Sequence, residues 1–224
     1  MNVSVRKRLV LVGIVATRLT LPELSYSAEK KAEKRKSPAT VDKALLIPED
    51  PICNFDFMNY KYPISDHTLK TTGVPPEVVL RNGAASLVSA TGKNVDMGIT
   101  KIIYGELTRD NAYEAVVRMS TIVVGSEYGT DDLYVFRYVS STPVLLGIIS
   151  EYDMDSAFLK YFPGGVLSHG LTGIKIHGRT LEVEKNVETA VNEPKYNVRI
   201  TYRYGNGKLS VSGMPVKVPY RPFP

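Results

Sequence analysis

Apolar and polar residues alternate along most of the chain from Pro51 onward, and turn-forming residues separate the short alternating runs. The clearest run is 196–204 (YNVRITYRY), which ends at a Gly-Asn-Gly turn at 205–207. A period of two is typical of a strand with one buried face. The apolar residues at 209 and 211 continue the pattern after the turn, so the sequence predicts a hairpin.

A second hairpin is predicted over 174–183, where apolar pairs flank Gly178. Four further runs of β-branched or aromatic residues are separated by turn residues and lie at 99–104, 115–124, 133–139 and 144–149. Strands at this spacing, with few long helical patterns, predict a mainly β fold. We expect an antiparallel meander that forms a sandwich or a small barrel.

Only one segment has helical spacing. Met154, Phe158 and Phe162 recur at this spacing in 151–162 (EYDMDSAFLKYF). The pattern predicts at most one short helix, with an aromatic loop over the sheet as the alternative. The opening segment 48–76 is rich in Pro and aromatic residues, and we expect it to wrap an edge of the sheet with little regular structure.

The first residues follow a different pattern. A basic cluster at 6–8 precedes an apolar run at 9–16, and small residues follow at 25–28. This order is typical of a secretory leader and predicts a signal peptide over 1–28, the alternative being a basic N-terminus of a cytoplasmic protein. The rest then divides into a charged linker at 29–50, a single β domain at 51–219 and a tail at 220–224.

Charge is distributed unevenly. Residues 1–37 contain nine Lys or Arg against three Glu, a net charge of +6, while the whole chain carries +5, so residues 38–224 carry −1. A nearly neutral body does not predict a face that tracks a phosphate backbone, and we expect no nucleic-acid partner. The apolar run at 9–16 is shorter than the roughly 20 residues of a spanning helix, so no integral membrane segment is expected after leader removal.

Cys53 is the only cysteine, so the chain has no internal disulfide. An exported protein without disulfides is more typical of bacteria than of a eukaryotic secretory route. We therefore expect a periplasmic or secreted bacterial protein.

The segment 104–117 (YGELTRDNAYEAVV) carries a regular series of oxygen-bearing groups. These are the side chains of Glu106, Thr108, Asp110 and Glu114 and the backbone carbonyl of Ala112. Oxygens at alternate positions of a tight turn can hold a hard cation, so the spacing indicates calcium as a candidate ligand; no other cofactor is indicated.

One feature of this turn favours a structure without metal. Arg109 is cationic and opposes a bound cation. In the alternative, Asp110 and Glu114 bond backbone amides or Arg109 and hold the two flanking strands in register. Asn111 is expected to adopt the left-handed backbone conformation that such a turn requires.

The same segment resembles the YGDLTGDGxxEAVV stretch of a loosely defined set of exported bacterial proteins of unknown function, and its turn is similar to that of FG-GAP and VCBS-type blades. Glu106 stands for Asp, and Arg109 and Asn111 replace two glycines. Upstream, 57–63 (FMNYKYP) is similar to the DFxNFxYP opening of that set. The resemblance implies a secreted β module that recognises a ligand, and it assigns no catalytic residues to this chain. In blades of that type the acidic turn can hold calcium.

Aromatic residues form two stripes, one with Tyr134, Phe136 and Tyr138 and one with Tyr196, Tyr202 and Tyr204; Tyr202 and Tyr204 are the candidate binding residues of the second. Each stripe either fills the core or, if it faces solvent, offers a platform for a ligand, because Tyr combines apolar area with a polar tip. Our first hypothesis is therefore a non-catalytic exported domain that binds a protein or cell-envelope ligand through these residues.

Catalytic motifs are absent from the sequence: it has no nucleophile elbow, P-loop or HExxH. The alternative hypotheses are a hydrolase that uses Glu151, Asp153, Asp155 and His169, and a structural module of an envelope assembly. Ser168 and His169 are adjacent, and neighbouring side chains on an extended chain point in opposite directions, which disfavours a serine hydrolase.

Overall fold

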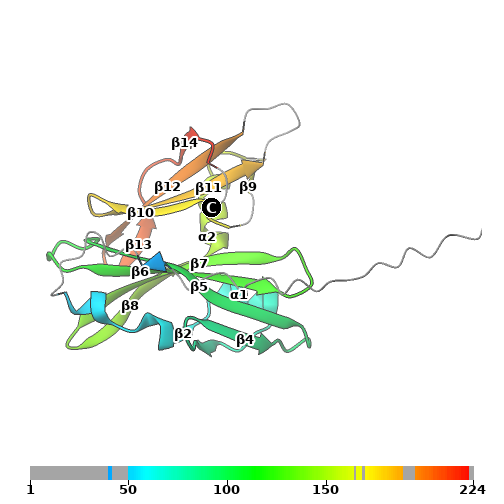
Figure 1. Ribbon diagram of the computed structural model, residues 1–224. Coiled ribbons are helices and arrows are strands. Elements are labelled where there is room, and N and C mark those ends of the chain that lie inside the picture. Colours follow the sequence, from blue (N-terminus) through cyan, green and yellow to red (C-terminus); the bar gives the residue numbers. More distant parts are fainter. Residues whose placement is uncertain (1–39, 42–49, 164, 168–169, 189–194, 222–224) are drawn as a thin grey trace, which may run out of the picture. The chain divides into compact units, whose positions relative to one another are not determined.

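The computed structural model describes residues 40–41, 50–163, 165–167, 170–188 and 195–221, which belong to one compact unit, Ser37–Pro224 (Figure 1). The signal peptide predicted at 1–28 and most of the predicted linker at 29–50 lie outside the described residues.

The first sheet has six strands. They are β1 (Thr40–Val41), β4 (Ala84–Val88), β5 (Asn94–Gly105), β6 (Glu114–Val123), β7 (Gly129–Val139) and β8 (Thr142–Ile149). Strands β5 to β8 form an antiparallel meander, and both β4 and the parallel strand β1 pair with β5. The predicted order of strands in this half of the chain is therefore confirmed.

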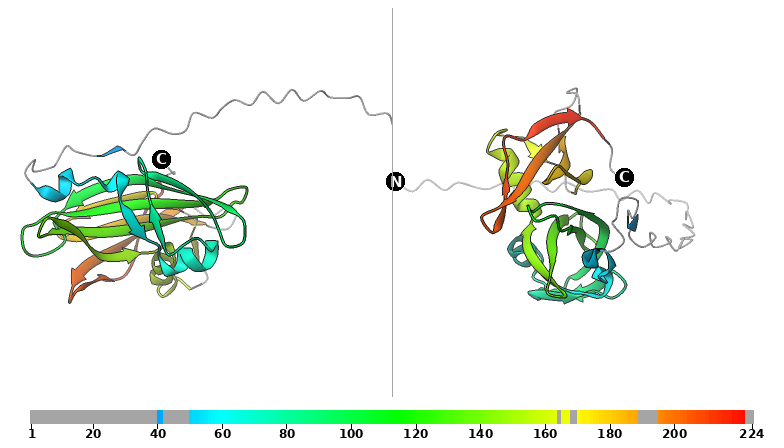
Figure 2. Two further views of the ribbon diagram at one scale, coloured as in Figure 1. Left: turned by 90° about the horizontal axis from the view of Figure 1, so that it is seen from below. Right: turned by 90° about the vertical axis from the view of Figure 1, so that its left-hand side faces the viewer.

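This sheet is strongly curled (Figure 2, right). The pairing register shifts between Ile99 and Lys101 in β5, and again between Val135 and Phe136 in β7. A β-bulge bends its strand and increases the local twist, so these two irregularities account for part of the curl.

The second sheet also has six strands. They are β9 (Val166–Leu167), β10 (Gly173–His177), β11 (Thr180–Glu188), β12 (Tyr196–Gly205), β13 (Lys208–Val211) and β14 (Val216–Pro219). All of its pairings are antiparallel. Both predicted hairpins are present, as β10–β11 and β12–β13.

The remaining elements are short. They are the 3₁₀ turns η1 (Pro51–Asn54) and η2 (Phe57–Asn59), the paired strands β2 (Lys61–Pro63) and β3 (Glu77–Val79), and the helices α1 (Asp66–Thr72) and α2 (Glu151–Leu159). Ser65 caps the N-terminus of α1, and Gly73 ends it in a left-handed conformation with φ of 70°. Ser150 and Asp153 form a capping box at the start of α2.

The curled sheet has a hydrophobic core on each of its faces. On one face, alternate residues of β6 and β7 such as Val117 and Tyr134 pack with Phe57, Tyr62 and other residues of the opening segment. On the other face, Val116 and Leu133 pack with the second sheet and α2. Strands β6 and β7 are buried on both sides for this reason, which explains their long apolar runs.

The mainly β class with antiparallel sheets, consistent with a sandwich or small barrel, is confirmed. Two details differ from the sequence prediction. The structure has a second helix, α1, where 48–76 was expected to have little regular structure, because Ser65 and Gly73 supply both helix caps. Strand β1 lies within the segment predicted as a linker. Across the described part of the chain, none of the helices has the length and apolar character that crossing a membrane requires.

Candidate functional site

The turn between β5 and β6 is organised around Glu114, whose side chain is completely buried. Its carboxylate accepts hydrogen bonds from the backbone N–H of Leu107 at 2.6 Å and from that of Thr108 at 3.3 Å. Thr108 Oγ1 lies 2.6 Å from Glu114 Oε1 and 2.5 Å from Asp110 Oδ1. Glu114 therefore closes the turn from within, as the metal-free alternative predicted.

The outer oxygens of the turn contact arginines. Asp110 forms an ion pair with Arg137 of β7, and Glu106 lies 3.6 Å from Arg179 of the β10–β11 turn. Asn111 has a φ of 60°, so the predicted left-handed conformation is confirmed. These contacts tie the turn to both sheets.

The five predicted calcium ligands therefore differ in their surroundings. Glu114 and Thr108 are buried, Ala112 and Glu106 are half-buried, and Asp110 is exposed. Within the ranges that the structure describes, no three His, Cys, Asp or Glu side chains gather in a group that could hold a metal ion. Calcium binding at this turn stays a prediction.

The first aromatic stripe belongs mainly to the core. Tyr134 and Phe136 are completely buried against the aromatic residues of the opening segment, with Phe136 5.2 Å from Phe57 and Tyr134 5.3 Å from Tyr62 between ring centroids. Tyr138 is half-buried against the same core. The alternative that this stripe fills the core applies to Tyr134 and Phe136, because the segment after Pro51 covers this face of the sheet.

The second stripe is divided. Tyr202 is 4% exposed and packs in the core between the sheets, whereas Tyr204 is half-buried. Burial, with the nearby Asp153 and Asp155, raises the pKa of Tyr202 far above its ordinary value. Tyr204 thus remains the more accessible residue of the pair.

The acidic residues of the hydrolase hypothesis make structural contacts. Glu151 Oε1 and Asp155 Oδ1 each lie 2.7 Å from Lys185 Nζ, and Lys185 is completely buried. Glu151 also accepts hydrogen bonds from the backbone N–H groups of Gly170 and Asp131. Asp153 completes the capping box of α2, and His169 lies outside the described residues.

A pocket of about 720 Å³ opens where the two helices begin. We call it the helix pocket; its lining comes from the start of α1, the end of β8 and the start of α2. The lining residues are Ile64, Ser65, Asp66, His67, Lys70, Ile148, Ser150, Tyr152 and Asp153. A concave site with apolar walls and a few convergent polar groups is the usual form of a ligand site.

One buried carboxylate fixes the two helix starts. Asp132 of β7 is 2% exposed, and its Oδ2 accepts hydrogen bonds from Ser65 Oγ at 2.7 Å and Thr68 Oγ1 at 2.9 Å in the α1 region. The backbone N–H of Glu151 in α2 also bonds to this carboxyl. Burial raises the pKa of Asp132, and these hydrogen bonds together with the charge of His67 partly offset the rise.

The accessible groups of the helix pocket are an aromatic pair and charges of both signs. The rings of His67 and Tyr152 stack with centroids 5.4 Å apart and planes 18° apart, and Tyr152 is 60% exposed. Lys70 and Asp66 are exposed beside them. The arrangement can hold a ring or a planar group against the aromatic pair while polar groups fix its orientation.

A smaller hollow of about 450 Å³ lies on the other side of the α2 start and shares Ile148 and Asp153 with the helix pocket. Tyr202 lines it. No hydrogen-bond partner for the Tyr202 hydroxyl is found in the described part of the structure. Tyr202 is thus a predicted binding residue that lines a hollow adjoining the helix pocket.

Comparisons with models of protein families, with curated proteins and with solved structures found no match. The site therefore has to be interpreted from its own geometry.

Sequence reasoning missed His67 and Tyr152 as site residues. The available signals were Ser65 and Gly73, which are typical helix-cap residues and flank 66–72. A polar helix predicted there would have placed His67 near its start, but it would not have revealed that α2, about 80 residues later in the chain, begins beside it.

Proposed function

We propose that this chain is an exported, non-catalytic β domain that binds a protein or cell-envelope ligand, and that the helix pocket is its binding site. The observation that carries the proposal is the exposed Tyr152 ring stacked on His67 at the mouth of a 720 Å³ pocket. Tyrosine combines apolar area with a polar tip and is enriched among the residues that contribute most to binding.

The chemistry of the pocket fits a ligand with a ring and several polar groups. Ile64 and Ile148 supply apolar walls, Lys70 and His67 can donate hydrogen bonds, and Asp66 can accept them. A sugar residue of the cell envelope or an aromatic side chain of a partner protein has this combination of a ring and polar substituents.

The hydroxyl groups of the pocket support a non-catalytic role. Ser65 Oγ accepts the hydrogen bond of the Thr68 backbone N–H and donates to Asp132. Ser150 Oγ accepts from the backbone N–H of Asp153 and donates to its carboxylate. Both serines are buried helix caps, and this structural role accounts for their contacts with the two carboxylates.

Export is supported by the leader-like order of residues at 1–28, and the single cysteine favours a bacterial over a eukaryotic secretory route. The mass of the protein recovered from its native host tests this part. Loss of 27 or 28 N-terminal residues is the expected result, and an intact N-terminus in the cytoplasm would contradict export.

Binding is tested by capture from envelope extract on the immobilised full chain, with half of the extract treated with protease. We expect Tyr152→Ala to abolish capture and Tyr161→Ala to preserve it. Tyr161 is a matched control because it is a tyrosine, 37% exposed, that follows α2 outside the pocket. Equal capture by both variants would contradict the assignment of the pocket, and protease sensitivity would separate a protein ligand from a glycan.

A further inference from the structure

A second concave site lies far from the helix starts, where the β5–β6 turn meets the second sheet. A hollow of about 370 Å³, which we call the arginine hollow, is lined by Leu107, Arg109, Gly178, Arg179, Arg203 and Tyr204. Three of its six lining residues are arginines, and they come from three separate segments. Such convergence of guanidinium groups is unfavourable unless an anion offsets their mutual repulsion.

Two of these arginines have no acidic partner. Within the described ranges, neither Arg109 nor Arg203 makes a side-chain hydrogen bond or an ion pair, and both are exposed. Arg179 lies 3.6 Å from Glu106, and Asp110, the other nearby carboxylate, pairs with Arg137. The donors of Arg109 and Arg203 are therefore available to an anion from outside the chain.

The backbone at Arg179 provides an independent argument. The β10–β11 turn places Gly178 at φ 51° and Arg179 at φ 63°, whereas the β12–β13 turn of the same sheet uses Asn206 at φ 50° and Gly207 at φ 76°. Both positions of such a turn need positive φ, which Gly and Asn adopt most easily. An arginine at the position that Gly207 occupies in the other hairpin is conformationally costly, and costly backbone conformations are retained most often at functional sites.

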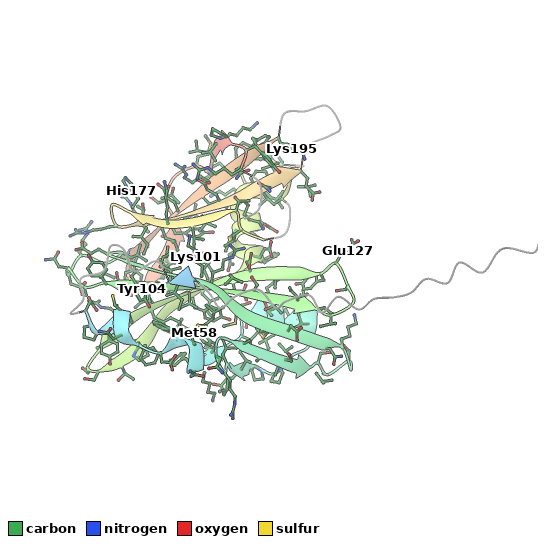
Figure 3. All side chains as sticks on the ribbon, viewed as in Figure 1. Met58, Lys101, Tyr104, Glu127, His177 and Lys195 are labelled. Atoms are coloured by element: carbon green, nitrogen blue, oxygen red, sulfur yellow. The ribbon has the colours of Figure 1, made fainter. Side chains whose placement is uncertain are left out.

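An aromatic hollow continues the site. A second hollow of about 540 Å³ shares Gly178 and Arg179 with the arginine hollow. The rest of its lining is Tyr104, Gly105, Glu106, Tyr113 and Ile176, and the Glu106 carboxylate lies on the Arg179 side at 3.6 Å. Figure 3 labels Tyr104 at the end of β5 and His177 at the end of β10, the strands of the two sheets that contribute Tyr104 and Ile176 to this hollow. Burial raises the pKa of Tyr104 to about 12, so its hydroxyl is a neutral hydrogen-bonding group at physiological pH.

We propose that the arginine hollow binds a carboxylate or phosphate group carried by an acidic glycan, whose sugar rings lie against Tyr204 and the adjacent tyrosines. Arginine recognises both oxyanions by paired hydrogen bonds, and tyrosine rings pack on the apolar faces of sugars while their hydroxyls bond to sugar oxygens. A long nucleic acid fits less well, because residues 38–224 carry a net charge of −1.

The test is calorimetric titration of the full chain with four probes: a galacturonic acid trimer, mannose 6-phosphate, a neutral galactose trimer and a hexaglutamate peptide. We expect the first two to bind and the neutral trimer to bind at least tenfold more weakly. Stronger binding of the galacturonic acid trimer would identify carboxylate as the preferred group, and stronger binding of mannose 6-phosphate would identify phosphate. Equal binding of the neutral trimer, equal binding of hexaglutamate, or no binding of either acidic sugar would overturn the proposal.

Variants locate the site. Arg203→Gln and Arg109→Gln are each expected to weaken binding of the acidic sugar by about tenfold, the usual effect of losing a charged hydrogen bond. Arg81→Gln is the matched control, since Arg81 is exposed and lies outside both hollows. Arg203→Lys keeps the charge but loses the planar guanidinium with its paired donors. If this variant binds the acidic sugar as tightly as the wild type, recognition by paired hydrogen bonds is overturned.

Arg179→Gly gives the sharpest readout. If Arg179 is retained for the ligand, this variant keeps or raises Tm, because glycine relaxes the turn, while its affinity for the acidic sugar falls. A fall in Tm with unchanged affinity would overturn the role of Arg179. Tyr152→Ala in the helix pocket should leave this binding unchanged, so the outcome is independent of the proposed function above.

Discussion

The Lys185 ammonium lies 2.7 Å from the Glu151 carboxylate, with the two side chains 1% and 4% exposed. Lys185 occupies the same face of β11 as Leu181, Val183 and Val187, which form the core between the sheets. The ion pair therefore joins helix α2 to the second sheet inside the core. Breaking one side of such a pair is costly because the remaining charge is left buried.

We expect Lys185→Met to lower the free energy of unfolding by about 3–5 kcal/mol, since Glu151 is then charged and buried without its cation. The control is Lys61→Met, which removes the same side chain from a surface pair with Glu77 whose members are 57% and 54% exposed. Loss of that pair is expected to cost about 0–1 kcal/mol. Denaturant unfolding measures both, and equal losses would contradict the importance of the buried pair.

The double variant Lys185→Met with Glu151→Gln separates charge from packing. Glutamine carries no charge and keeps one acceptor oxygen, which replaces one of the two carboxylate oxygens that accept from the backbone N–H groups of Gly170 and Asp131. Part of the stability lost in Lys185→Met should therefore return in the double variant. A further loss, additive with that of Glu151→Gln alone, would show that the two side chains act independently.

Strands and hairpins were predictable because their signals are local. The alternation at 196–204 and the turns around Gly178 and Gly207 depend only on neighbouring residues, and β10–β13 follow them closely. Lys185 shows where local reasoning ends. Its position on the apolar face of β11 indicates that a buried partner is required, but nothing near it in sequence identifies Glu151, which lies on a helix 34 residues earlier.

The binding sites were less predictable for the same reason. Whether Tyr134 and Phe136 face solvent depends on the segment that covers their sheet, and the sequence pattern of β7 is the same in either case. The helix pocket and the arginine hollow are each assembled from segments distant in sequence. Arg109 was recognisable from sequence as an obstacle to calcium, but its proximity to Arg179 and Arg203 required the fold.

Asp132 predicts a dependence of stability on pH. Burial is the main cause that raises its folded-state pKa above the ordinary value of 3.8, so the folded state binds the proton more tightly than the unfolded chain. The contribution of Asp132 to the free energy of unfolding is therefore fully present below about pH 3.8. It is lost as the pH rises from about 3.8 through the raised folded pKa. Unfolding free energies of the wild type and Asp132→Asn, measured from pH 4 to 7, should differ by this contribution.

Asparagine retains an oxygen that accepts hydrogen bonds from Ser65 and Thr68, so the variant removes the titrating group while preserving acceptor geometry. The free energy of unfolding of the wild type minus that of Asp132→Asn should therefore rise as the pH falls toward 4. A constant difference across the range would show that Asp132 does not titrate within it.

The β5–β6 turn predicts a contrast between its two central carboxylates. Glu114 is completely buried and accepts from Leu107 and Thr108, so Glu114→Gln should lower the free energy of unfolding by about 1.5–3 kcal/mol. Asp110→Asn removes a partly exposed pair with Arg137 and should cost less, about 0–1 kcal/mol. Chemical denaturation of the two variants measures the contrast, and equal effects would contradict the central role of Glu114.

The same turn provides the test for calcium. Its acceptors are already occupied by backbone N–H groups and Arg137, so we expect no rise in Tm when calcium replaces a chelator. A bound ion at 100 times its dissociation constant would instead stabilise the fold by about 2.7 kcal/mol. A stabilisation of this size, lost in Glu114→Gln, would establish the metal site.

The two sheets approach each other closely at Gly105, which lines the 540 Å³ hollow beside Tyr104 and Tyr113. A Cβ atom at this position would lie 2.9 Å from Ile176 Cγ2 and 3.1 Å from its Cβ, closer than packed carbon atoms allow. Gly105→Ala should therefore push β10 away from β5 and lower the free energy of unfolding by about 1–3 kcal/mol, the usual cost of overpacking. Combining it with Ile176→Ala removes Cγ2, the nearest clashing atom, so the double variant should be less destabilised than the sum of the single ones. Denaturant unfolding of the three variants measures this coupling, and strict additivity would show that the two sheets do not meet at Gly105.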